Sequence, residues 1–157
     1  MKGSEELPSE ELPNQESQVE GHFEHFEHGA DIGVRGFGAT PAAAFEQLGL
    51  AVTAIVVDLS ALEVLDECVT IELEGAELDE LLFDWVDALV FEMSTRSVLF
   101  GRFELKIEDQ RLRARMWGAP VDRLRHEPAV EVKGPTYTEL RVAKQSGGWV
   151  AQCVVDV

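Results

Sequence analysis

The segment at residues 28–33, His-Gly-Ala-Asp-Ile-Gly, contains a single acid, Asp31, with small residues on both sides. Because Ala30 and Gly33 leave room around it, an ion or another chain can approach the Asp31 carboxylate closely. Asp and Gly are also typical of ordinary tight turns, in which Asp hydrogen-bonds its own backbone and Gly supplies a positive φ. Taken alone, this spacing favours a turn and leaves a ligand site as the alternative.

Two further oxygen donors lie at the end of the sequence. Asp156 is the penultimate residue, and Val157 offers a terminal carboxylate. Together with Asp31 these groups would supply oxygen ligands for a hard divalent cation such as Mg, Mn or Ca, whereas zinc prefers Cys and His. For Asp156 the sequence alone favours a solvated strand end. A zinc site at His22, His25 and His28 is disfavoured, because on a strand the middle histidine faces away from the other two.

The sequence contains no motif of a self-sufficient covalent catalyst. It has no G-x-S-x-G nucleophile elbow, no G-x-x-x-x-G-K phosphate loop and no C-x-x-C pair. Its two cysteines, Cys68 and Cys153, fall in strand patterns, where a structural role is usual. Two cysteines are too few for a disulfide framework, and the sequence leaves open whether they pair.

The composition predicts one acidic domain. The chain has 157 residues, 45% of them hydrophobic, and a formal net charge of −17. This charge argues against binding of nucleic-acid phosphates, which needs clustered Lys and Arg, and points to metal ions, basic protein surfaces or solubility. Residues 1–20 hold six Glu and one Lys and almost nothing apolar. We therefore expect a disordered acidic tail over 1–20 and a single domain over 21–157.

No apolar run approaches the ~18 residues of a membrane span, and no charged-then-hydrophobic leader follows Met1. The sequence therefore predicts no membrane association, and a cytoplasmic location is expected. The oligomeric state is left open.

Residue spacing predicts the elements that would position the acids. Alternation predicts strands at 22–28 and 32–37, on either side of the Asp31 turn, and another at 69–73. Helical spacing predicts helices at 41–57, after the Thr40-Pro41 cap, and at 77–96. Later in the chain we expect a hairpin over 103–116 with its turn at Asp109-Gln110, an irregular excursion over 117–135, and a closing hairpin over 137–157.

This order of elements predicts an α+β fold. The expected architecture is a single two-layer domain with a mainly antiparallel or mixed β-sheet and two helices packed on one face. The row Arg111, Arg113 and Arg115 is the one local basic cluster. It suits either an RNA-contacting edge or, with Glu104 and Glu108 on the same face, a cross-strand charge ladder, and the ladder is favoured.

Six short segments, in this order and spacing, make the sequence resemble the archease family. The resemblance runs from about His22 to the last residue and leaves only the acidic tail outside. The segments are Phe26–His28 with Ala30–Gly33, Leu81–Trp85, Trp117–Gly118, Arg125–Pro128, Glu131–Lys133 with Thr136–Tyr137, and Asp156–Val157.

The resemblance implies an accessory protein rather than an enzyme. Archeases assist the RtcB-type RNA ligase, which joins RNA ends carrying a 2′,3′-cyclic phosphate and a 5′-hydroxyl in tRNA splicing and RNA repair. They promote guanylylation of the ligase histidine and allow multiple turnover. The family's metal-binding positions match Asp31, Asp156 and Val157, and its lysine matches Lys133, which thereby takes an accessory catalytic role. The expected partner is the ligase, with no direct contact to nucleic acid.

The sequence departs from the family pattern near these residues. Gly29 stands where a Thr is usual, Gly134 and Pro135 replace a small and an aliphatic residue, and Thr138 replaces a frequent His. Two other functions stay open: a stand-alone metal-dependent phosphoester hydrolase, since Asp31, Asp156 and Lys133 could serve a phosphate, and an acidic chaperone-like binder of basic proteins.

Overall fold

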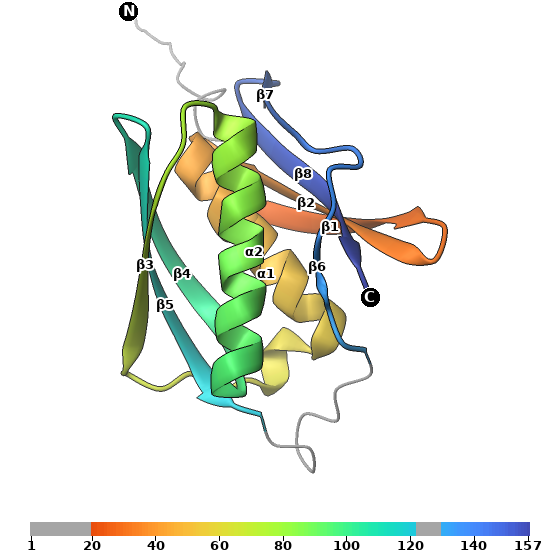
Figure 1. Ribbon diagram of the computed structural model, residues 1–157, viewed down its shortest axis with the longest axis vertical. Coiled ribbons are helices and arrows are strands. Elements are labelled where there is room, and N and C mark those ends of the chain that lie inside the picture. The colour runs from red at the N-terminus through yellow and green to blue at the C-terminus, as the bar shows by residue number, and fades with distance from the viewer. Residues whose placement is uncertain (1–19, 122–129) are drawn as a thin grey trace, which may run out of the picture.

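Two antiparallel sheets and two α-helices form the part of the protein that the structure, a computed structural model, describes, namely residues 20–121 and 130–157 (Figure 1). The larger sheet has the order β1-β2-β8-β6, with β7 also paired to β8, and the smaller has the order β3-β5-β4. The strands are β1 (His22–His28), β2 (Asp31–Gly38), β3 (Cys68–Glu74), β4 (Val98–Glu108), β5 (Arg111–Pro120), β6 (Gly134–Pro135), β7 (Arg141–Gln145) and β8 (Gly148–Asp156).

The α+β class predicted from the sequence is confirmed, and the strands divide between two sheets. The predicted disordered tail and the Arg125–Pro128 segment lie outside the described residues, apart from residue 20. Within the described ranges no helix is long and apolar enough to cross a membrane. Cys68 is exposed, Cys153 is buried, and both are free thiols, which answers the question of their pairing.

Helix α1 (Pro41–Val56) begins as its sequence predicts. The Thr40 hydroxyl accepts a hydrogen bond of 3.1 Å from the Ala43 N–H, and Pro41 occupies the first turn, where its missing N–H leaves no bond unmade. Helix α2 (Leu78–Arg96) ends where Ser97 adopts a left-handed conformation with φ of 53°. A short 3₁₀ turn, η2 (Leu59–Ala61), follows α1.

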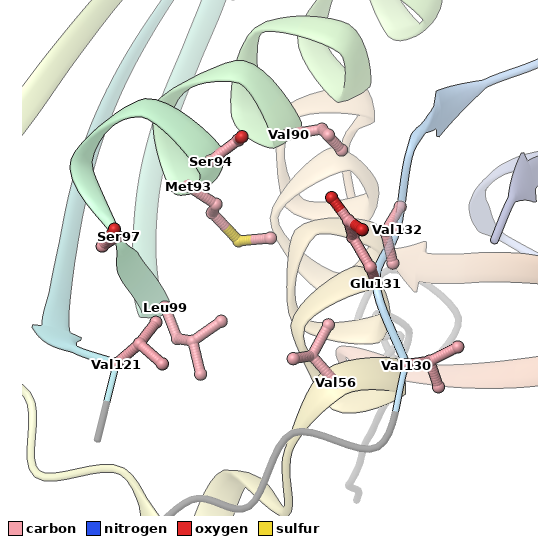
Figure 2. A pocket seen from close by; sticks show the side chains of 10 residues that line it. All are labelled: Val56, Val90, Met93, Ser94, Ser97, Leu99, Val121, Val130, Glu131 and Val132. Atoms are coloured by element: carbon pink, nitrogen blue, oxygen red, sulfur yellow. The ribbon is translucent and has the colours of Figure 1, made fainter. Parts of the chain in front are cut away.

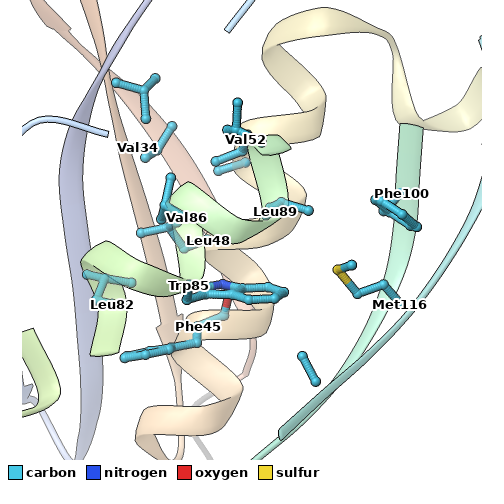
Figure 3. Close-up of a cluster of buried hydrophobic side chains, with 14 of the residues drawn as sticks. Val34, Phe45, Leu48, Val52, Leu82, Trp85, Val86, Leu89, Phe100 and Met116 are labelled. Carbon is cyan, nitrogen blue, oxygen red and sulfur yellow. The ribbon is translucent and has the colours of Figure 1, made fainter. Parts of the chain in front are cut away.

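Helix α1 contacts β2 and β8 of the larger sheet and β4 of the smaller, so the core lies around it. Its close approach to β2 depends on Gly36, where a Cβ atom would lie 2.3 Å from the Ala44 carbonyl oxygen. Figure 3 shows Trp85 of α2 beside Phe45 of α1, and the indole N–H donates to the Phe45 carbonyl at 3.2 Å. This bond satisfies the polar atom of a side chain that is fully buried.

The hairpin β4–β5 forms with the predicted turn, in which Asp109 and Gln110 both have positive φ. The predicted excursion over 117–135 is wrong at its start, because β5 continues through Trp117 to Pro120. The alternation is hidden there because Trp117, Gly118 and Ala119 are all buried, so this end of the strand is covered on both faces.

The arginines of β5 form the predicted charge ladder. Arg115 lies 3.4 Å from Glu104 across the hairpin, while Arg111 and Arg113 lie 3.5 and 3.6 Å from Glu74 and Glu72 of β3. Two of the three partners therefore come from β3, and Glu108 instead pairs with Lys106 at 3.6 Å. The ion pairs are exposed, so each contributes little to stability.

Candidate metal centre

Asp31 and Asp156 lie at one end of the larger sheet. Asp31 is the first residue of β2, Asp156 is the last of β8, and the antiparallel pairing of these strands begins at Ile32 opposite Val155. Asp31 and Asp156 therefore lie one residue beyond this pair, opposite one another at the end of the two strands. Residues opposite one another in an antiparallel pair have side chains on the same face. The register thus predicts that the two carboxylates share a face.

This face is the one turned away from α1. Gly36 lies against α1, and Val34, which shares its face, is fully buried. Side chains alternate along a strand, so Asp31, Gly33 and Arg35 lie on the outer face. Asp31 is half-buried and Asp156 is exposed, so both can be reached from solvent.

The turn that precedes Asp31 contains Gly29 and Ala30, because His28 pairs with Asp31 across the hairpin. The sequence predicted that Asp31 lies within the turn. The structure places Asp31 one step later, as the first residue of β2. Gly29 has a φ of +63°, with no atom within 4 Å of the position a Cβ would take. A β-branched Thr is strained at such a φ, so Gly suits this turn better.

The third segment at this end of the sheet contains Lys133. Its N–H donates a 2.8 Å hydrogen bond to the Asp156 carbonyl oxygen, and the next residues form β6, with Gly134 opposite Asp156 and Pro135 opposite Val155. Among the described residues Lys133 makes no ion pair with Asp31 or Asp156. The structure therefore brings the main chain of Lys133, and not its ammonium group, to the two acids.

An aromatic ring covers the strand beside Asp31. A Cβ atom built at Gly33 would lie 2.3 Å from the ring of Phe26, so the ring rests directly on the Gly33 backbone. The Arg35 guanidinium lies 4.4 Å from the centre of the same ring, within the range of a cation–π contact. These residues hold β1 and β2 together on the face that carries Asp31.

A row of polar side chains continues across β8. Arg35 donates to the Gln152 side-chain oxygen at 2.9 Å and to Glu24 at 2.8 Å, while the Gln152 amide donates to the Glu139 carbonyl at 3.1 Å. Gln152 is only 5% exposed, and these bonds satisfy both ends of its amide. This row was not identified from the sequence. Counting the register from the Gly29-Ala30 turn would have placed Glu24 opposite Arg35.

The donor atoms fit a hard cation rather than zinc. In the described part of the chain no group of three or more His, Cys, Asp or Glu side chains comes together. His25 lies 2.8 Å from the Ala51 carbonyl oxygen, whereas His22 stacks on Phe37. Asp31 and Asp156 are two carboxylates at this end of the sheet, and Val157 follows Asp156 directly after β8 ends. A set made only of oxygen atoms suits Mg, Mn or Ca.

A pocket of about 680 Å³ lies elsewhere, between the C-terminal ends of the two helices and the segment before β6 (Figure 2). Its wall is about half polar and half apolar, with Val56 of α1, Met93 of α2 and Leu99 of β4 among the apolar residues, while Glu131 and Val132 close one side. It contains neither Asp31 nor Asp156. The proposed metal ligands therefore lie on an open face of the sheet, outside this cavity.

Comparison with known proteins covers the same region. Residues 23–157 match the model of the Archease protein family (MTH1598/TM1083). The protein archease of Pyrococcus furiosus is 37% identical over 140 residues, which cover 86% of this chain and 98% of the relative, and that of Methanopyrus kandleri is 37% identical over 139 residues, which cover 86% and 99%.

Two solved structures share the fold. The solution structure of Methanobacterium thermoautotrophicum protein 1598 is 29% identical, with a TM-score of 0.73 over 86% of this chain and 98% of the other. The crystal structure of an archease from Thermotoga maritima is 20% identical, with a TM-score of 0.54 over 84% of this chain and 94% of the other, and supports the fold alone. The family match and the identities over most of each chain lead to one conclusion: this chain belongs to the archease family.

Proposed function

We propose that this chain is a metal-binding accessory protein that activates an RtcB-type RNA ligase in tRNA splicing and RNA repair. Asp31, Asp156 and the carboxylate of Val157 would hold the divalent cation. Family membership supports the ligase as partner. The observation that supports the metal site is the register, since Asp31 comes just before Ile32, Asp156 comes just after Val155, and Ile32 pairs with Val155.

The chain's own residues would act by positioning. The Arg35–Gln152 bond fixes β2 beside β8, and the Phe26 ring on Gly33 holds β1 against β2, so the strand that carries Asp31 is supported on both sides. A divalent cation held there would neutralise charge on the phosphates during guanylylation of the ligase histidine. Lys133 is exposed and adds an ammonium at the same end of the sheet. It would assist the same charge neutralisation from outside the metal ligands.

The charge of the chain suits a protein partner that itself binds RNA. A net charge of −17 repels RNA phosphates and attracts a basic surface. Accordingly, the proposed role involves contact with the ligase and none with RNA. The chain would carry out no reaction alone.

Ligase turnover tests this function. A purified RtcB-type ligase is incubated with GTP, Mn²⁺, RNA ends and substoichiometric amounts of this protein, and both ligase guanylylation and joined RNA are followed. Wild-type protein should raise the number of turnovers. Asp31→Asn and Asp156→Asn should lose this gain, while Glu108→Gln, an exposed acid of the other sheet, should keep it.

The proposal would be overturned if wild-type protein did not raise the number of ligase turnovers. It would also be overturned if both acid variants raised that number as much as wild type does. The same preparations incubated without ligase on a panel of phosphoesters test the hydrolase alternative. Metal-dependent hydrolysis that disappears in Asp31→Asn would show an enzyme instead of an activator.

A further inference from the structure

The side of α2 that faces away from the core carries aromatic and acidic residues at helical spacing. We call this the α2 outer face, and in Figure 1 it lies toward the viewer. It lies opposite the buried stripe of the same helix, which contains Leu82, Trp85 and Leu89. Its members are Glu80, Phe83, Asp84, Asp87 and Phe91.

Aromatic rings on this face are open to solvent. Phe91 is 61% exposed, and Tyr137, from the loop after β6, is 74% exposed. Tyr137 stacks on Phe83 with ring centres 4.1 Å apart and planes 3° from parallel, so one face of its ring remains open. Among the described residues the one other exposed large hydrophobic side chain is Leu65, at 53%. Exposed aromatic rings, here Phe91 on α2 and Tyr137 on the loop stacked against α2, are enriched at protein interfaces.

The acids on the same face have no cationic partner within the described residues. Glu80, Asp84 and Asp87 follow one another at spacings of four and three, so like charges are neighbours along the helix. Burial, and then the charges of Glu80 and Asp87, raise the pKa of the Asp84 carboxyl. Asp84 and Asp87 lie beyond the first turn, so the helix dipole does not offset their repulsion. Glu80 accepts a 3.1 Å hydrogen bond from the Ala76 N–H, whereas Asp84 and Asp87 have no hydrogen bond or ion pair among the described residues.

Charge decides which partner this face can take. RNA and anionic membranes carry phosphates that these acids repel. A second copy of the chain would bring the same acids face to face in a two-fold interface. A basic polypeptide meets both features, since an arginine guanidinium stacks on an aromatic ring and pairs with a carboxylate at the same time.

We propose that the α2 outer face and Tyr137 dock a basic segment of a partner protein, with arginine side chains stacked on the open face of Tyr137 and paired to Asp84 and Asp87. Phe91 supplies the apolar contact at the other end of the face. This surface is separate from the acids at the end of β2 and β8. The inference therefore stands whether or not those acids bind a metal.

A peptide titration tests the proposal. The probe is a fluorescent, alanine-based helical peptide with arginines at positions i, i+4 and i+7 and one leucine, and its control has glutamine in place of each arginine. Fluorescence anisotropy of the peptide gives its Kd for the full-length chain at ~0.15 M salt, which screens distant charges. The arginine peptide should bind, and the glutamine peptide should not.

Paired variants locate the binding surface. Asp84→Asn with Asp87→Asn, and separately Phe91→Ala with Tyr137→Ala, should each weaken binding at least about tenfold. The charge-matched control is Glu72→Gln with Glu74→Gln on β3, and the apolar control is Leu65→Ala. Both controls should leave Kd unchanged. Amide chemical shifts of the wild-type chain should move along Glu80–Phe91 and at Tyr137, which reports the surface without any variant.

Several outcomes would overturn the proposal. The first is a loss of peptide affinity in the Glu72/Glu74 control as large as that in the Asp84/Asp87 variant. The others are amide chemical-shift changes that map to another face, and no binding of the arginine peptide. Sedimentation that shows a dimer lost in Phe91→Ala would assign the face to a second copy. Binding of a single-stranded RNA or of phosphatidylserine vesicles that depends on Phe91 and Tyr137 would assign it to those ligands instead.

Discussion

The main chains of Lys133 and Asp156 are joined by a 2.8 Å hydrogen bond from the Lys133 N–H to the Asp156 carbonyl oxygen. Substitution of either side chain leaves this bond in place. The position of the lysine relative to the acids is thus a property of the backbone, and the role of its ammonium can be tested separately from the fold.

Replacing Lys133 with methionine should separate activation from metal binding. The variant keeps the backbone bond and a similar stem length, and the Lys133 ammonium forms no ion pair with the described acids. We expect an unchanged melting temperature and unchanged Mn²⁺ affinity, with a lower rate of ligase guanylylation. A weaker Mn²⁺ affinity would place the lysine in the metal site itself, contrary to this account.

Gly33→Ala should destabilise the outer face of the larger sheet. The new Cβ would lie 2.3 Å from the Phe26 ring, so the ring must move off the strand. Displacing this half-buried ring should lower the free energy of unfolding, which urea denaturation measures. Phe26→Ala removes the clash. The loss of unfolding free energy caused by Gly33→Ala should therefore be much smaller in a Phe26→Ala background than in wild type. Additive losses would show that the ring does not rest on Gly33.

The two thiols should differ in reactivity. Cys68 is exposed, while burial raises the pKa of Cys153 to about 12, so Cys153 carries almost no thiolate near pH 8. A thiol reagent at pH 8 should label one site in the native protein and two in urea. Cys68→Ser should then show no native labelling. Rapid labelling of the native Cys68→Ser variant would mean that β8 opens readily.

Glu46 should make stability depend on pH. Burial is the main cause that raises the pKa of its carboxyl above the ordinary value of 4.5, opposed by the hydrogen bond from the Leu105 N–H and assisted by Glu104. A raised folded-state pKa means that stability is lost as pH rises from 4.5 through that pKa. Glu46→Gln keeps an acceptor for Leu105 and avoids this loss. Its melting temperature should exceed that of wild type at pH 7, and the difference should close below pH 4.5.

Local chemistry made much of the fold predictable. Thr40-Pro41 fixed the start of α1, and Asp109-Gln110 fixed the β4–β5 turn, because each acts through bonds within a few residues. The division into two sheets was not predictable, because strand pairing between β3 and β5 involves residues far apart in the chain. The end of β5 at Trp117–Pro120 was also not predicted as a strand, because a strand buried on both faces shows no alternation of apolar and polar residues.

The candidate site consists of residues that the sequence itself suggests, but their arrangement could not be predicted from the sequence. The chemistry of Asp31 and Asp156 is visible in the sequence, and their common face follows only from the β2–β8 register. The Arg35–Gln152 bond joins residues 117 positions apart, so no local pattern marks it. The α2 outer face has no distinct sequence signal, because charged side chains are usual on the solvent side of any amphipathic helix.

Titration with Mn²⁺, followed by calorimetry, tests the proposed metal centre most directly. Wild-type protein should bind a single ion. Asp31→Asn, Asp156→Asn and a chain extended by a short Gly-Ser tail beyond Val157 should each bind it at least about tenfold more weakly, because each loses the negative charge of one proposed carboxylate ligand. Glu108→Gln should bind as wild type, and all variants should keep the wild-type circular dichroism. Absence of binding by wild type would contradict the metal centre at the end of β2 and β8. So would an affinity for Mn²⁺ in the three altered proteins equal to that of wild type.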